Sequence, residues 1–282
     1  MMMKMDLTLL PIVGIAFICE LVDSSLGMGY GTILTPVLML MGYNPLQIVP
    51  VVLISELATG ATAALLHQKA GNVKFDFRND PEHWITQRLG KLGYMPKSKD
   101  SKVALVLAAC SVIGTITAVF IAVSIPKKIL KLYIGLLVLS MGLIILWKRN
   151  AQHKFSWKKI LGLGTIASFN KGISGGGYGP VVTAGQILSG LPGKSAVAIT
   201  SLAESLTCLV GVLAYVYTGK VADWGLAPYL VVGAMASVPL AVNAVKVMGD
   251  KKLTLVIGVV TLMLGLLVLS VEMGLLSLSV SL

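Results

Sequence analysis

The sequence predicts an all-α polytopic membrane protein with two inverted repeats, each made of a broken, re-entrant helix pair plus three full spans. Only 12% of the 282 residues are charged and 56% are hydrophobic, whereas a soluble domain averages about 25% charged residues. Charge-free runs such as 103–125 and 253–271 reach the roughly 20 residues that a membrane-spanning helix needs. A glycine-rich interruption also occurs twice, which indicates an internal repeat.

Ten hydrophobic segments follow one another along the chain. They lie at 7–22, 30–42, 46–68, 102–124, 128–147, 159–169, 179–190, 195–218, 225–245 and 252–271. The stretches 7–42 and 159–190 are each too long for one span at about 1.5 Å per residue. A glycine cluster interrupts each stretch near its middle. We therefore expect each stretch to form two short helices joined by unwound backbone.

The two interruptions are related by a constant offset of 148 residues. The first reads Gly27-Met28-Gly29-Tyr30-Gly31, and the second reads Gly175-Gly176-Gly177-Tyr178-Gly179. The same offset relates Glu56 to Glu204, two acidic residues in otherwise apolar segments. Such coincidences indicate a duplication. We expect the first transmembrane repeat at residues 1–150 and the second at 151–282.

The distribution of Lys and Arg predicts the orientation. If both interrupted stretches turn back, 17 basic residues lie on one side of the membrane and five on the other. If both stretches cross, the asymmetry falls to about 15 against seven. The positive-inside rule favours the first arrangement, in which the repeat is inverted, the loop 69–101 is cytoplasmic and both termini are extracytoplasmic. We expect the protein in the cell (plasma) membrane, with this loop acting as a solvated orientation signal or, alternatively, in regulation.

The glycine-rich interruptions form the predicted binding site. Unwound backbone in the hydrocarbon layer persists only where it is buried in protein or lines a cavity, and N–H groups at the start of a helix attract anions. We therefore expect a small anionic substrate to bind there. The candidate residues are Ser24, Ser25, Gly27, Gly29, Asn170, Lys171, Ser174, Gly175, Gly176 and Gly177. Close helix packing through small residues is the alternative explanation for the glycines.

Charged residues within the apolar segments need a purpose, because a buried cation costs about 2.5–3.5 kcal/mol on the insertion scale. Lys171 occupies the position equivalent to Asp23, so Lys171 either binds the anionic substrate or pairs with Asp23. Glu56 and Glu204 lie about ten residues into their segments, near the membrane midplane. Because burial favours a neutral carboxyl group, both glutamates are candidates for proton coupling. A structural, hydrogen-bonded clasp is the alternative role.

Other function classes receive little support from the residues. The cysteines are dispersed, no C-x-x-C or H-E-x-x-H motif is present, and we expect no metal, no cofactor and no enzyme activity. The net charge of +11 is better explained by membrane orientation than by nucleic-acid binding. An ion channel is the alternative function, although the Gly-Tyr-Gly segments lack the Thr-Val pair of potassium-channel filters. The assembly state is open, with a homodimer as one candidate.

Together these elements resemble the TauE/SafE sulfite exporter family of membrane anion permeases. The resemblance covers nearly the whole chain, and its most specific part is the segment from Asn170 to Gly177. In the first half, Met28 stands where a glycine is more usual. The resemblance implies a secondary transporter for a small sulfur-containing oxyanion such as sulfite, sulfoacetate, thiosulfate or a sulfonate. It leaves open which anion moves, in which direction and with which coupling ion, and a permease for another small anion is an alternative.

Overall fold

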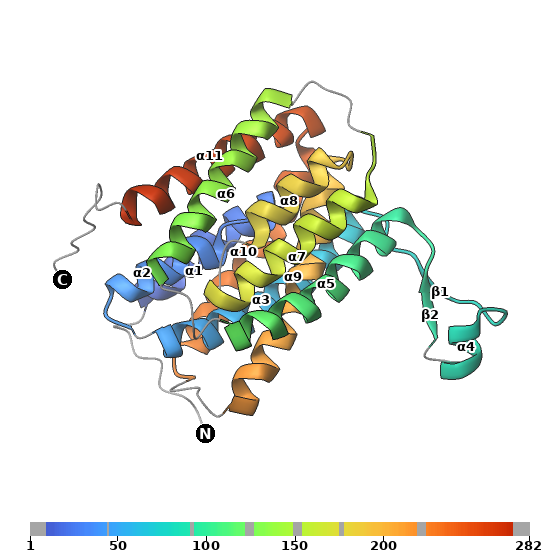
Figure 1. The fold of residues 1–282 in the computed structure, drawn as a ribbon, viewed down its shortest axis with the longest axis horizontal. Coiled ribbons are helices and arrows are strands. Elements are labelled where there is room, and N and C mark those ends of the chain that lie inside the picture. Colours follow the sequence, from blue (N-terminus) through green and yellow to red (C-terminus); the bar gives the residue numbers. More distant parts are fainter. Residues whose placement is uncertain are drawn as a thin grey trace.

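The computed structural model describes residues 10–43, 45–90, 93–121, 127–148, 154–174, 178–218 and 224–272. In these residues the chain is mostly helical, with one pair of short strands (Figure 1). The helices are α1 (Leu10–Leu26), α2 (Tyr30–Leu40), α3 (Pro45–Ala70), α4 (Trp84–Leu89), α5 (Lys99–Ile121), α6 (Lys127–Lys148), α7 (Trp157–Ser174), α8 (Tyr178–Leu188), α9 (Gly193–Thr218), α10 (Ala227–Val247) and α11 (Asp250–Glu272). The strands are β1 (Phe77–Asn79) and β2 (Tyr94–Pro96).

Each of the ten predicted hydrophobic segments corresponds to one helix of the structure. The largest differences concern the helices that precede the two interruptions. The segments predicted to end at residues 22 and 169 continue as helix to Leu26 and Ser174. These extra turns carry polar and charged residues, among them Asp23 and Lys171, which interrupt the hydrophobic pattern but not the backbone hydrogen bonding of the helix.

Four helices of the described chain are long and apolar enough to cross a membrane. They contain the windows Gln47–Ala70, Gly193–Tyr217, Ala227–Val247 and Asp250–Ser270. By contrast, α2 and α8 each have 11 residues, a length of about 16 Å at 1.5 Å per residue. Neither can cross a hydrocarbon layer of about 30 Å. Every residue of α8 is buried, so this short helix lies inside the protein rather than against lipid.

Helices from the first and second halves of the chain pack against each other. The helix α1 packs along α10, and α7 packs along α5. The helix α3 packs against α9, and α6 packs against α11 along one edge of the body (Figure 1). The two halves therefore build a shared core instead of two separate units.

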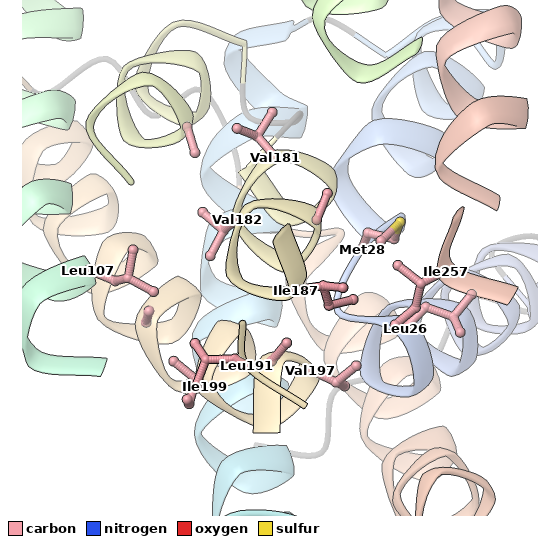
Figure 2. Close-up of a cluster of buried hydrophobic side chains, with 14 of the residues drawn as sticks. Leu26, Met28, Leu107, Val181, Val182, Ile187, Leu191, Val197, Ile199 and Ile257 are labelled. Atoms are coloured by element: carbon pink, nitrogen blue, oxygen red, sulfur yellow. The ribbon is translucent and has the colours of Figure 1, made fainter. Parts of the chain in front are cut away.

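The larger hydrophobic cluster surrounds α8. Figure 2 shows Val181, Val182 and Ile187 projecting from α8 in different directions, with Met28 on one side of the helix and Leu107 of α5 on the other. Burial on all sides explains why α8 has no polar face like that of a surface helix. A second cluster joins α1, α2, α3 and α10.

Several helices begin or end at the same end of the helical body. Near the start of α7, the Lys159 Nζ donates a hydrogen bond to the carbonyl of Leu188, the last residue of α8, over 3.1 Å. The start of α7 and the end of α8 therefore lie at the same level of the helical body. At this end, Lys194 Nζ of α9 also donates to the Lys246 carbonyl of α10 over 2.7 Å.

The loop between α3 and α5 carries local structure that the sequence did not predict. The strands β1 and β2 pair antiparallel, and with α4 they project from one end of the helical body (Figure 1). Lys97 Nζ donates to Asp80 Oδ2 over 2.6 Å. This contact is the main reason why the pKa of the Asp80 carboxyl lies below its usual value. Most of this segment is exposed.

Candidate functional site

The first predicted interruption is a true break between helices. The helix α1 ends at Leu26 and α2 begins at Tyr30. Gly27 and Gly29 take φ angles of 70° and 128°, which residues with a side chain rarely adopt. The Gly27 N–H donates to the Asp23 carbonyl over 2.6 Å. That amide is therefore committed within the protein, whereas the sequence suggested that it could bind substrate.

The protein's own carboxylates occupy the start of α2. The Tyr30 N–H donates to Asp23 Oδ1 over 3.1 Å, and the Gly31 N–H donates to Glu56 Oε1 over 3.2 Å. A helix N-terminus attracts negative charge, and in the structure two acidic side chains of the protein itself occupy this position. The predicted binding of an anionic substrate at this break stays a prediction.

The second interruption lies between α7, which ends at Ser174, and α8, which begins at Tyr178. Gly175, Gly176 and Gly177 lie outside the described residues, as does the side chain of Ser174. Their predicted roles in substrate binding therefore stay predictions.

The first half of α8 touches the first break. Thr183 of α8 donates a hydrogen bond from Oγ1 to the Gly27 carbonyl over 2.9 Å. A methyl group on Gly179 would overlap the Gly27 carbonyl oxygen and lie 2.7 Å from the Met28 Cα. Glycine at position 179 thus permits the start of α8 to lie directly against the unwound backbone of the first break.

Lys171 forms the centre of a buried ionic cluster. Its Nζ lies 2.5 Å from Glu56 Oε2 and 2.8 Å from Glu204 Oε1. All three residues are at most 5% exposed. The predicted pairing of Lys171 with Asp23 is not the arrangement found, because Asp23 faces the α2 backbone and Lys171 faces the two glutamates. Sequence offset alone could not show which acids a long lysine side chain reaches.

Three helices converge to build this cluster, with Glu56 on α3, Lys171 on α7 and Glu204 on α9. Glu56 receives further hydrogen bonds, one from the Gly31 amide and one from Cys208 Sγ at 3.4 Å. A buried ion pair is stable only when such additional contacts satisfy its remaining polar atoms. Glu56 therefore links the start of α2 with α7 and α9.

The remaining predicted donors are oriented less favourably for a ligand. The Ser24 Oγ donates to Glu20 Oε1 over 2.5 Å, and the Ser25 Oγ donates to the Leu21 carbonyl over 2.6 Å. Helical serines commonly bond to the preceding turn in this way, so both hydroxyls are engaged within α1. Asn170 is fully buried beside Lys171.

A second series of buried polar residues, which was not predicted from the sequence, begins at Glu20. This residue is 1% exposed. Ser24 binds Glu20 through its hydroxyl, and its carbonyl lies 3.2 Å from His67 Nε2. The His67 Nδ1 lies 2.9 Å from Asn72 Nδ2 at the end of α3. An acidic residue inside an apolar segment is a signal for function or pairing. That signal marked Glu56 and Glu204, and it applies equally to Glu20.

The sequence is similar to known membrane proteins. Over 178 residues the chain is 28% identical to "Probable membrane transporter protein YtnM" of Bacillus subtilis (strain 168). The aligned region covers 60% of this chain and 51% of that relative. The chain thus spans about half the length of this curated relative. No solved structure matches the chain significantly. Residues 12–78 and 89–268 match the family described as Sulfite exporter TauE/SafE. This match includes both breaks and the ionic cluster, and the protein belongs to the sulfite exporter TauE/SafE family.

Proposed function

We propose that the protein is a secondary transporter that moves a small sulfur-containing oxyanion, such as sulfite, sulfoacetate, thiosulfate or a sulfonate, across the cell membrane. Family membership and the long apolar helices support a membrane permease. The relative from Bacillus subtilis carries the name of a membrane transporter. The choice of a sulfur oxyanion rests on the family's description, and the buried ammonium group of Lys171 is the group that can bind an anion.

The observation that carries this proposal is the buried ammonium group of Lys171. Placing a cation at membrane depth costs about 2.5–3.5 kcal/mol on the insertion scale. A protein keeps such a group where it pairs or where it serves a charged ligand. In this structure Lys171 pairs with two glutamates beside a helix break, which is the arrangement expected of a transporter site at the interface of two repeats.

The helix arrangement supports an inverted repeat with re-entrant helix pairs. The start of α7 and the end of α8 lie at the same level, as a re-entrant pair requires. The pairing of α1 with α10 resembles that of α7 with α5, because α10 and α5 hold corresponding positions in the two halves. We propose that one half rocks against the other, with the loop between α3 and α5 in the cytoplasm and both termini outside.

The charges of the cluster support proton coupling. Two glutamates and one lysine carry one excess negative charge when all three are ionised. An oxyanion that arrives beside Lys171 adds another, and like charges at short range repel strongly away from water. Uptake of a proton by Glu56 or Glu204 removes this repulsion. We therefore propose that the anion and a proton move together.

The ion-channel alternative gains no support from the Gly-Tyr-Gly segments. Tyr30 and Tyr178 are the first residues of helices and are fully buried. The Tyr30 hydroxyl lies 2.8 Å from Ser55 Oγ, and the Tyr178 hydroxyl lies 3.4 Å from Ser111 Oγ. These contacts place both tyrosines in helix packing, whereas a channel filter needs rings of carbonyl groups around a pore.

Transport by purified protein in liposomes tests the proposal. We expect radiolabelled sulfite or thiosulfate uptake to saturate with concentration and to show counterflow when unlabelled anion is inside. Protein-free liposomes and the exposed-site variant Lys158→Met serve as controls. Flux that rises linearly with concentration and shows no counterflow would contradict a carrier.

A pH gradient tests the coupling separately. We expect wild-type liposomes to accumulate sulfite on the side toward which protons flow. Glu204→Gln should keep counterflow but lose much of its response to the gradient, because one proton acceptor is gone. An unchanged response in both Glu56→Gln and Glu204→Gln would rule out coupling through these residues.

A further inference from the structure

Glu20 is a buried acid without a cation beside it. It lies near the middle of α1, which packs against α10, α2, α9, α3 and α11. Within the described residues, the ion pairs inside the helical body join Lys171 to Glu56 and Glu204 and do not reach Glu20. A buried charge is very costly unless it is paired and hydrogen-bonded. The carboxyl group of Glu20 therefore needs another way to become neutral.

The hydrogen bonds of Glu20 are also few. Ser24 donates its one hydroxyl hydrogen to Glu20 Oε1, and Oε2 has no hydrogen-bond partner among the described residues. An ionised carboxylate can accept about four hydrogen bonds, and buried polar atoms almost always find a partner. Glu56, by contrast, receives hydrogen bonds from Lys171 and from the Gly31 amide. Glu20 thus has the surroundings of a neutral carboxyl group, and Glu56 has those of an ionised one.

The titratable groups around Glu20 do not supply a positive charge to it. The helix α10 has no titratable residue between Tyr229 and Lys246, and α11 has none between Lys252 and Glu272. The groups that face Glu20 from α1, α2, α3 and α9 are Cys19, Asp23, Tyr30, Glu56, His67 and Glu204. Of these only His67 can become a cation, and its Nε2 lies 3.2 Å from the Ser24 carbonyl. The nearby acids oppose a further negative charge at Glu20.

A proton suits this position better than a metal ion. Calcium and magnesium are bound by about six or more oxygen ligands. The described part of the chain contains no group of three or more His, Cys, Asp or Glu residues that could hold a metal ion. A proton needs only one oxygen atom. With the proton on Oε2, Glu20 keeps Oε1 as the carbonyl oxygen that accepts from Ser24.

We propose that Glu20 is a further proton-binding site of the protein, separate from the ionic cluster, and that it carries a proton at neutral pH. The inference rests on the proposed proton-coupled transport and adds one proton to that of Glu56 or Glu204. When the two halves separate and water reaches α1, the Glu20 carboxyl ionises. When they close, it takes up a proton again, so each cycle moves this proton together with the anion.

Infrared spectroscopy in lipid at neutral pH tests the site itself. A protonated carboxyl group has a C=O stretching band at higher frequency than the carboxylate and amide bands. We expect wild type to show this band and Glu20→Gln to lack the part that Glu20 contributes. The matched control is Glu82→Gln, which changes an exposed glutamate of the loop between α3 and α5 and should leave the band as in wild type.

Ser24→Ala tests the same band without removing the acid. This variant deletes the hydrogen bond to Glu20 Oε1, and a carbonyl group that loses a hydrogen bond stretches at higher frequency. We therefore expect the band to shift upward in Ser24→Ala. It keeps the carboxyl group and so tests the site even where Glu20→Gln does not fold. An unshifted band in Ser24→Ala, or a wild-type band in Glu20→Gln, would overturn the proton site.

Accumulation in liposomes tests whether this proton is coupled to transport. With the membrane potential held at zero, a gradient of about one pH unit changes the final ratio of internal to external anion about tenfold for each coupled proton. In the same gradient, the ratio for Glu20→Gln should be about tenfold lower than for wild type. The Glu82→Gln control should reach the wild-type ratio. An equal ratio for Glu20→Gln and wild type would overturn the coupling of this proton.

The two measurements separate this inference from the proposed function. A Glu20 band together with no uptake by wild type would support the proton site and contradict transport. Saturable wild-type uptake without a Glu20 band would overturn the proton site and leave the transporter intact. Absence of both would contradict both.

Discussion

The two glycine-rich segments have similar sequences but lie beside residues of opposite charge. At equivalent positions, the first break carries Asp23 and the second carries Lys171. Asp23 accepts the Tyr30 amide at the start of α2, whereas Lys171 reaches across the core to Glu56 and Glu204. Equivalent positions of the sequence therefore carry opposite charges and contact different partners. Internal similarity of the sequence indicates where buried charged groups lie, whereas the residue type at each position determines which partners they contact.

This asymmetry changes the expected role of the first break. Two matching amide nests would each attract an anion. In the structure, the carboxylates of Asp23 and Glu56 already accept amides at the first break. The cationic group, the Lys171 ammonium, lies in the second half of the chain.

The largest effect is expected from Lys171→Met. Removal of the ammonium leaves Glu56 and Glu204 buried without their cation, and breaking a buried ion pair in this way costs about 3–5 kcal/mol. Equilibrium unfolding in detergent measures the loss. Lys158→Met, on the exposed face of the same helix, should unfold like wild type. Equal stability of the two variants would contradict the ionic cluster.

The next largest effect concerns the contact between the start of α8 and the first break. Gly179→Ala places a methyl group against the Gly27 carbonyl and the Met28 Cα, an overlap with backbone that costs about 1–3 kcal/mol or more. The matched control is Gly162→Ala in α7, where a methyl group meets nothing within 4 Å. That change should be neutral or stabilise the helix by about 0.5–1 kcal/mol. Similar melting temperatures for the two variants would show that the start of α8 does not lie against the first break.

A smaller effect is expected at Asp23. Asp23→Ala removes the acceptor at the start of α2 and should lower the unfolding free energy by about 0.5–2 kcal/mol, as for other helix caps. Asp23→Asn keeps an acceptor oxygen and should lose less. Melting curves of the two variants against Lys171→Met measure the contrast directly. If Asp23→Ala were as damaging as Lys171→Met, the two positions would have equivalent roles after all.

The smallest effect concerns the structured loop between α3 and α5. The pKa of Asp80 is lowered in the folded protein, mainly by Lys97, so its stabilising contribution is present above the unfolded pKa and is lost as pH falls through the folded one. Amide hydrogen exchange in β1 and β2 should therefore accelerate only below about pH 4. Asp80→Asn should remove this acid sensitivity and leave sulfite uptake at neutral pH unchanged. Reduced uptake in this variant would favour the regulatory role of the loop.

Much of the fold was predictable because the membrane imposes strong patterns. Hydrophobic runs located the long helices, and the repeated glycines located the first break and the limits of the second. The helix ends beyond residues 22 and 169 were missed, since polar residues such as Asn170 continue a helix without continuing its hydrophobic pattern. The β1–β2 pair was missed because three-residue strands leave almost no periodicity.

The site was predictable in part. Buried Lys171, Glu56 and Glu204 were each conspicuous, because charge at membrane depth is costly. Their mutual contact was not, since it depends on how α3, α7 and α9 cross.

The most direct test of the ionic cluster between Lys171, Glu56 and Glu204 is a double-mutant cycle, which measures the effect of Lys171→Met in two backgrounds. In wild type, Lys171→Met should destabilise the protein. In the Glu56→Gln/Glu204→Gln background it should stabilise the protein, because there the lysine is the unpaired buried charge. An effect of the same sign and size in both backgrounds would contradict an ionic cluster that joins the two halves.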